Sequence, residues 1–245
     1  MTTSTRATRI LGVLAAGGLA LTAVLALVVS PADVNQKDAV RLLYIHVPTA
    51  WLALYLSFGV TTLCSALYLW PRTRSRFWDL AAGASAEIGV LFLGLTLVIG
   101  SIWGRTTWGV WWTWDARLTT TAVLFVLYLG YLALRRLPAS HDQRAKRCAI
   151  AGLIAVIDVP IVYGSVEWWR TLHQEATVRE IGDVQISGSM LFSLFVGVVA
   201  FTLVYLWLMV HKTRIARMED ALDDHGLDLA LEERRAEAAL EEVAP

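Results

Sequence analysis

The sequence has few charged side chains and few cysteines for its length. Only 17% of the 245 residues are Asp, Glu, Lys or Arg, and 56% are apolar, whereas soluble domains average about 25% charged and about 45–50% apolar. This composition excludes a disordered chain and an ordinary water-soluble globular domain. Two cysteines, Cys64 and Cys148, are too few for a disulfide framework. The chain also lacks the GxxxxGK[ST] motif, so it does not carry the phosphate-binding loop of the common ATPases.

Long apolar runs dominate the sequence. A bilayer core about 30 Å thick needs roughly 20 apolar residues of helix, and helices satisfy their own backbone hydrogen bonds in lipid. We therefore predict an all-α integral membrane protein with six transmembrane helices, at residues 10–30, 47–70, 80–101, 118–134, 148–166 and 190–210. The run at 10–30 exceeds the apolar core of about 7–15 residues in a signal peptide, so we expect an anchor and not a cleaved leader.

The formal net charge of zero hides an uneven distribution. Residues 219–245 carry ten acidic and two basic side chains, a net of −8, while residues 1–218 carry 11 acidic and 19 basic ones, a net of +8. We expect a membrane domain over residues 1–212 and an acidic, helical cytoplasmic tail over residues 213–245. The basic residues lie in short loops between apolar runs, which does not indicate nucleic-acid binding.

The loop charges predict the orientation. Of the 21 Lys and Arg residues, 15 fall near the chain termini and in the loops at 71–79 and 135–147. The positive-inside rule places both termini in the cytoplasm and the loops at 31–46, 102–117 and 167–189 on the other side.

The outer segment at about 102–119 is unusually rich in Trp, because four of the chain's 11 Trp lie within residues 108–114. Trp also gathers at membrane interfaces, and an anchoring belt is the alternative interpretation. In a short interfacial helix, Trp108, Trp111 and Trp112 would share one face. Such a face suits a flat hydrophobic ligand, with Asp115 and Arg117 at its end.

Two of the five histidines, His46 and His173, fall on the predicted outer side and flank this segment. A lone interfacial His is usually a surface residue, but two neutral imidazoles can occupy the two axial positions of a haem iron. Without nearby cysteines, they are too few for a usual zinc site. Haem propionates need cationic partners, and the outer candidates, in order of preference, are Arg117, Arg41, Arg105 and Arg170.

Three segments carry a family resemblance. WGVWWTWDARLTT (108–120) resembles the WWD signature of haem-handling proteins in cytochrome c maturation. YIHVPTAW (44–51) and SVEWWRTLH (165–173) resemble the histidine segments of one branch, haem exporter protein C (CcmC). The resemblance extends from about residue 40 to residue 210. Thr107, Val110 and Arg170 depart from the usual pattern, but none is an expected ligand.

The resemblance implies a bacterial inner-membrane protein, not an enzyme, that holds haem b at the periplasmic face and delivers it to the periplasmic haem chaperone CcmE. The implied partners are the ABC-transporter subunits CcmA and CcmB and the small membrane protein CcmD. By the matching motifs, His46 and His173 would be the axial ligands, and the residues that carry the platform would be Trp108, Trp111, Trp112, Trp114, Asp115 and Arg117.

Two other functions are open to a chain of this kind, an electron-carrying cytochrome b and a small-molecule transporter. Glu87 and Asp158 lie inside predicted spans, where ionisable groups are costly and commonly functional. We expect them to pack, to be hydrogen-bonded or to contact partner helices, and not to relay protons. Pro160 predicts a kink about one turn earlier in the fifth span.

Overall fold

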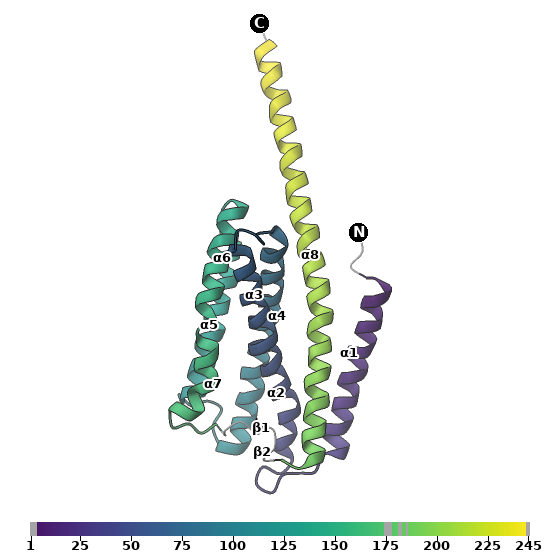
Figure 1. Ribbon diagram of the computed structural model, residues 1–245, viewed down its shortest axis with the longest axis vertical. Coiled ribbons are helices and arrows are strands. Elements are labelled where there is room, and N and C mark those ends of the chain that lie inside the picture. Colours follow the sequence, from purple (N-terminus) through teal and green to yellow (C-terminus); the bar gives the residue numbers. More distant parts are fainter. Residues whose placement is uncertain (1–3, 174–177, 181–182, 185, 244–245) are drawn as a thin grey trace.

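The computed structural model describes residues 4–173, 178–180, 183–184 and 186–243. Within these residues, six helices are long and apolar enough to cross a membrane, which confirms the predicted number: Arg6–Val29, Asp38–Leu69, Arg76–Trp108, Ala116–Arg136, His141–Trp168 and Gly188–Gly226. Two short antiparallel strands, β1 (Val178–Glu180) and β2 (Asp183–Val184), add a small hairpin before the last helix (Figure 1).

The six spans divide into helical elements of different kinds. The first comprises α1 (Arg6–Val24) and a π-helical turn, η1 (Leu25–Val29). The second comprises a 3₁₀ turn, η2 (Asp38–Leu42), α2 (Leu43–Trp51), a π-helical turn, η3 (Leu52–Ser57), and α3 (Phe58–Leu69). The others are α4 (Arg76–Trp108), α5 (Ala116–Arg136), α6 (His141–Ala155) with α7 (Asp158–Trp168), and α8 (Gly188–Val243).

The fifth span is interrupted where Pro160 predicts a kink. Proline has no N–H to donate to the carbonyl four residues earlier. Tighter turns replace the regular pattern here, because the Ile157 N–H donates to the Ile154 carbonyl at 3.2 Å and the Val159 N–H donates to the Val156 carbonyl at 3.0 Å. The break separates α6, which packs against α3 and α5, from α7, which packs against α5.

Both chain termini lie at the same end of the bundle (Figure 1), as an even number of spans requires. Helix α8 packs against α1, α2 and α4, while α5 packs against α4, α6 and α7. The residues expected to form a separate acidic tail continue α8 as one helix, which projects beyond the other helices at the end that holds the termini (Figure 1). The assignment of that end to the cytoplasm remains a prediction from the loop charges.

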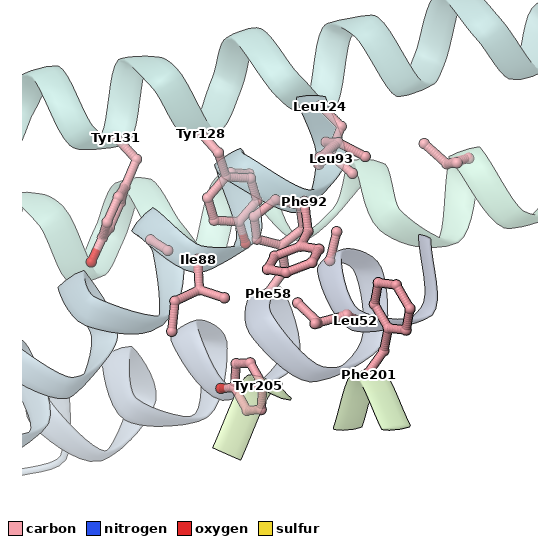
Figure 2. Close-up of a cluster of buried hydrophobic side chains, with 14 of the residues drawn as sticks. Leu52, Phe58, Ile88, Phe92, Leu93, Leu124, Tyr128, Tyr131, Phe201 and Tyr205 are labelled. Carbon is pink, nitrogen blue, oxygen red and sulfur yellow. The ribbon is translucent and has the colours of Figure 1, made fainter. Parts of the chain in front are cut away.

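A core of interlocking aromatic side chains fills the middle of the bundle (Figure 2). The rings of Phe58 and Tyr128 stack with centroids 3.6 Å apart and an angle of 10° between their planes. This stacking requires Gly89 on α4, since a Cβ there would lie 2.4 Å from Cε1 of Phe58. In lipid, close packing of this kind is the main force that holds helices together.

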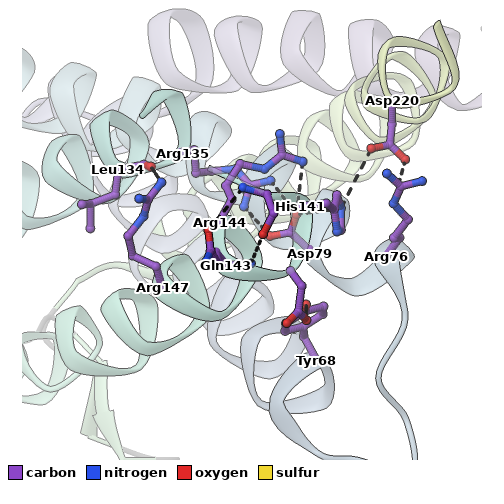
Figure 3. A network of polar contacts seen from close by, with 12 residues as sticks. Tyr68, Arg76, Asp79, Leu134, Arg135, His141, Gln143, Arg144, Arg147 and Asp220 are labelled. Atoms are coloured by element: carbon purple, nitrogen blue, oxygen red, sulfur yellow. Dashed lines mark hydrogen bonds and ion pairs between the residues drawn. The ribbon is translucent and has the colours of Figure 1, made fainter. Parts of the chain in front are cut away.

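A polar network joins four helices at the end of the bundle that holds the termini (Figure 3). At its centre is Asp79 of α4, which is 3% exposed. Its carboxylate accepts two hydrogen bonds from Arg135 of α5, at 2.6 and 3.2 Å, and lies 3.8 Å from His141 and 4.0 Å from Arg144, both of α6. Asp220 connects α8 to the same network, 3.9 Å from His141.

The two ionisable residues within predicted spans have different surroundings. Glu87, whose side chain is 48% exposed, forms an ion pair with Lys212 of α8. Asp158 begins α7, and its buried Oδ2 atom has no hydrogen-bond partner among the described residues.

We predict that Asp79→Asn destabilises the bundle by about 3–5 kcal/mol, because it leaves Arg135 buried without its counter-charge. The matched control is Asp38→Asn, which removes the exposed ion pair with Arg41 and should change the stability by less than about 1 kcal/mol. Adding Arg135→Gln to Asp79→Asn should recover part of the loss. Thermal unfolding in detergent measures all three, and equal stability of the two single variants would contradict the prediction.

Candidate functional site

The Trp-rich segment is built by the end of one helix and the start of the next. Helix α4 continues to Trp108 and ends at Gly109, whose φ of +80° lies in the left-handed region that glycine adopts without strain. Arg105 donates a hydrogen bond to the Gly109 carbonyl. Helix α5 begins after Asp115, whose Oδ1 accepts a hydrogen bond from the Leu118 N–H at 2.8 Å.

The predicted short interfacial helix is therefore wrong. Residues 102–108 belong to α4, and residues 109–115 form a non-helical turn between α4 and α5. Helical spacing does not continue across Gly109, because its left-handed backbone ends the helix there. The Trp side chains consequently do not share one face.

The four Trp of this segment divide into two pairs. Trp108 and Trp112 line a cavity, whereas Trp111 and Trp114 are 59% and 80% exposed. The Ser101 hydroxyl holds the turn against α4 by donating to the Trp111 carbonyl at 2.6 Å. Trp112 and Trp114 meet edge to face, with centroids 5.6 Å apart.

The cavity has a volume of about 510 Å³, within the usual range for sites that bind small molecules and cofactors. It brings together five of the eight predicted site residues: His46, Trp108, Trp112, Arg117 and His173. Trp111, Trp114 and Asp115 do not line it. Both histidines thus lie on one cavity although more than half of the chain's sequence separates them.

His46 lies on α2 and fits closely against α4. A Cβ at Gly100 would lie 2.8 Å from Cε1 of His46, so the imidazole depends on glycine at that position. Trp103 contacts the ring edge to face, with centroids 5.6 Å apart, and donates its indole N–H to Gln36 Oε1 at 2.7 Å. The Nδ1 atom of His46 is buried and has no hydrogen-bond partner in the described part of the chain.

His173 is positioned through Asp115. The Oδ2 atom of Asp115 accepts hydrogen bonds from the Thr171 hydroxyl at 2.7 Å and from the Leu172 N–H at 3.2 Å. The Thr171 hydroxyl oxygen accepts in turn from the His173 N–H at 3.0 Å. The His173 ring lies beside Trp108, with centroids 6.4 Å apart. One carboxylate therefore starts α5 and also holds the segment that carries His173.

Among the four arginines considered for anionic groups, Arg117 is the one that lines the cavity within the described residues. Its guanidinium donates to the Ser165 hydroxyl at 3.2 Å and to the Tyr163 carbonyl at 3.0 Å. Arg41 instead bonds to Asp38 and to the Ala26 carbonyl. Arg117, the preferred candidate of the four, thus lies at the cavity and joins α5 to α7.

Several lining residues did not emerge from the sequence. Gly100, Trp103 and Gly104 of α4 line the cavity, as do Tyr55 and Tyr163. The spacing of Gly100 and Gly104, four residues apart on one helix face, was an available signal for close approach. The two tyrosines had no local signal, because only the packing of α2 and η3 relative to α7 places them at the cavity.

Comparison with known proteins gives the family. The family model described as heme exporter protein C, CcmC, matches residues 1–225. Among similar proteins, the heme exporter protein C of Bradyrhizobium diazoefficiens is 41% identical over 180 residues, covering 73% of this chain and 67% of the relative. That of Haemophilus influenzae is 38% identical over 193 residues, covering 78% and 76%. A putative cytochrome c biosynthesis ccmC-like mitochondrial protein of Marchantia polymorpha is 39% identical over 173 residues, covering 71% and 72%.

Together with the six apolar helices, these matches define a multi-pass membrane component of a haem export system. More specifically, the chain belongs to the heme exporter protein C family, CcmC.

We predict that Asp115→Asn loosens the His173 segment while α5 stays intact. Asparagine keeps one carbonyl oxygen for the Leu118 N–H but loses the second acceptor, and a hydrogen bond to a charged group contributes about 1.5–3 kcal/mol. Hydrogen exchange at the Leu172 amide should accelerate by about tenfold or more. Asp33→Asn is the matched control, because Asp33 accepts backbone hydrogen bonds within a different loop, between η1 and η2. Unchanged exchange at Leu172 in Asp115→Asn would refute the positioning role.

Proposed function

We propose that the cavity binds haem b as cargo, with His46 and His173 as the axial ligands of the iron, and releases it to the haem chaperone CcmE. The observation that carries this proposal is that both histidines line one cavity together with Trp108, Trp112 and Arg117. A planar macrocycle with two open axial positions and two carboxylates matches this set of donors.

The chemistry of the lining residues supports haem as the cargo. A neutral imidazole is a good ligand for haem iron, and the buried Nδ1 of His46 has no other hydrogen-bond partner among the described residues. The indole rings of Trp103, Trp108 and Trp112 supply apolar surface for the porphyrin.

Two donors are suited to the haem propionates. Two of the five N–H donors of the Arg117 guanidinium form the bonds to Ser165 and Tyr163, so others are available for a carboxylate. The Trp112 Nε1 is buried and has no acceptor in the described part of the structure. Trp112 lies in the turn between α4 and α5 and Arg117 lies in the first turn of α5, so the two groups would hold the propionates at one edge of the macrocycle.

Release requires that an acceptor reach the bound haem. The exposed Trp111 and Trp114 lie next to the cavity-lining Trp112 and offer an apolar surface on which CcmE can dock.

In this proposal the Trp-rich turn faces the periplasm, residues 1–212 form the inner-membrane domain, and residues 213–245 extend into the cytoplasm. CcmA and CcmB would supply ATP hydrolysis, and CcmD would complete the assembly.

The first test is the visible spectrum of the purified protein supplied with haem. We expect a haem Soret band in the wild-type protein, a shifted or weakened band in His46→Ala and in His173→Ala, and at least about a tenfold loss of affinity in each. His225→Ala, which alters an exposed histidine of α8 that does not line the cavity, should behave as wild type. A wild-type protein that stays colourless with haem, or histidine variants with unchanged spectra, would refute the axial assignment.

The second test concerns the propionates. Wild-type protein should bind haem about tenfold or more tightly than haem dimethyl ester, because the ester cannot accept charge-assisted hydrogen bonds. Arg117→Gln should weaken haem binding and remove most of that preference, which a purely structural effect on α7 would not do. Arg41→Gln, outside the cavity, should keep the preference. Retention of the full preference in Arg117→Gln would show that the propionates bind elsewhere.

A further inference from the structure

The inner end of the cavity is closed by the aromatic core. Leu93 lines the cavity and is fully buried, and beyond it Leu124, Phe58 and Tyr128 are also fully buried (Figure 2). A separate polar crevice of about 180 Å³ lies toward the opposite end, where Glu87, Arg135 and Lys212 line it. Through the described residues, the packed core therefore separates the two hollows, and it leaves no passage for a large planar molecule.

Two of the segments that line the cavity are tethered by hydrogen bonds. The Gln36 side chain accepts the indole N–H of Trp103, which fastens the loop before η2 to α4. Asp115 holds Thr171 and Leu172 through its Oδ2 atom. These hydrogen bonds hold Gln36 and Leu172 in the lining of the cavity.

The lateral side of the cavity is different. Tyr55 of η3 and Tyr163 of α7 both line the cavity, yet their side chains are 45% and 49% exposed. Helix α2 and η3 pack against α4 and α8, whereas α7 packs against α5, and no extensive packing joins α7 to α2 or η3 within the described residues. Both tyrosines lie in helices that are long and apolar enough to cross a membrane, so in the proposed topology their exposed surfaces lie at the level of the bilayer.

This side of the cavity also has the polarity that an amphipathic ligand needs. Arg117 lines the same cavity as the two tyrosines, and its guanidinium donates a hydrogen bond to the Tyr163 carbonyl at 3.0 Å. Tyr163 is five residues before the end of α7 at Trp168, or about 8 Å along the helix. Tyr55 sits in a π-helical turn, an irregularity that often marks functional positions in helices.

We propose that Tyr55 and Tyr163 form a lateral gate through which haem enters the cavity from the outer half of the bilayer. This inference rests on the proposed haem-binding function. In this route the porphyrin stays in apolar surroundings until the imidazoles bind the iron, while Arg117 receives the carboxylates as they pass the tyrosine hydroxyls.

The experiment measures the rate at which protein in nanodiscs takes up haem from haem-loaded phosphatidylcholine vesicles, followed by the Soret band. Tyr55→Cys/Tyr163→Cys is made in a Cys64→Ser/Cys148→Ser background and joined with a short bifunctional thiol reagent, verified by mass spectrometry. We expect uptake to slow by about tenfold or more, equivalent to about 1.4 kcal/mol of added barrier. The Tyr55→Cys single variant, treated with the same reagent, should load several times faster than the cross-linked protein.

A second set of variants tests the gate without a cross-link. Tyr55→Ala and Tyr163→Ala should each accelerate uptake from vesicles severalfold, because they widen the opening. Phe195→Ala is the matched control, since Phe195 is an exposed aromatic residue of α8 that does not line the cavity, and its uptake rate should not change. Uptake by the cross-linked protein at the rate of the singly modified control, or no acceleration in either tyrosine variant, would overturn the gate.

These outcomes separate the gate from the haem-binding function on which it rests. If the wild-type protein shows no Soret band that depends on His46 and His173, the proposed function fails. If that band is present and the cross-linked protein reaches it at an unchanged rate, the function stands and the lateral gate is wrong.

Discussion

The geometry of the site depends on the two oxygen atoms of one carboxylate. Asp115 Oδ1 caps the first turn of α5, and Oδ2 holds Thr171 and Leu172. The cap determines where α5 begins and hence where Arg117 lies, and the second oxygen determines where His173 lies. Because an ionised carboxylate accepts several hydrogen bonds at once, a single residue aligns two segments that are distant in sequence.

Close approach of helices creates the rest of the site. Lipid provides no hydrophobic force between helices, so association relies on tight packing and on small residues that permit it. Gly89 lets Phe58 stack on Tyr128 in the core, and Gly100 lets the His46 imidazole lie against α4. At the other end of the bundle, Asp79 holds α5 and α6 to α4 through Arg135, His141 and Arg144 (Figure 3). Polar interactions of Asp115 and Asp79 therefore join the helices at the two ends of the bundle, and apolar packing joins them in the middle.

The sequence predicts correctly those features that depend on a local or additive property. Hydrophobic run length is such a property, and the six spans match the described helices. The prediction is wrong at Gly109, because helical periodicity does not extend across a residue whose backbone is left-handed. The error matters for the site, since it placed Trp111 beside Trp108 and Trp112. In the structure the turn directs Trp108 and Trp112 to the cavity and leaves Trp111 and Trp114 exposed.

By itself, the sequence determined the membrane class, the number of spans and the family resemblance, and it singled out His46 and His173 as a candidate pair of ligands. These properties depend on the length of apolar runs and on short motifs, which consecutive residues define. Only the tertiary structure decided that His46 and His173 line one cavity, that Arg117 and not Arg41 joins them, and that Tyr55 and Tyr163 belong to the same lining. These outcomes depend on distances between residues on different helices. Such distances follow from how the helices pack, and no local pattern of residues contains them.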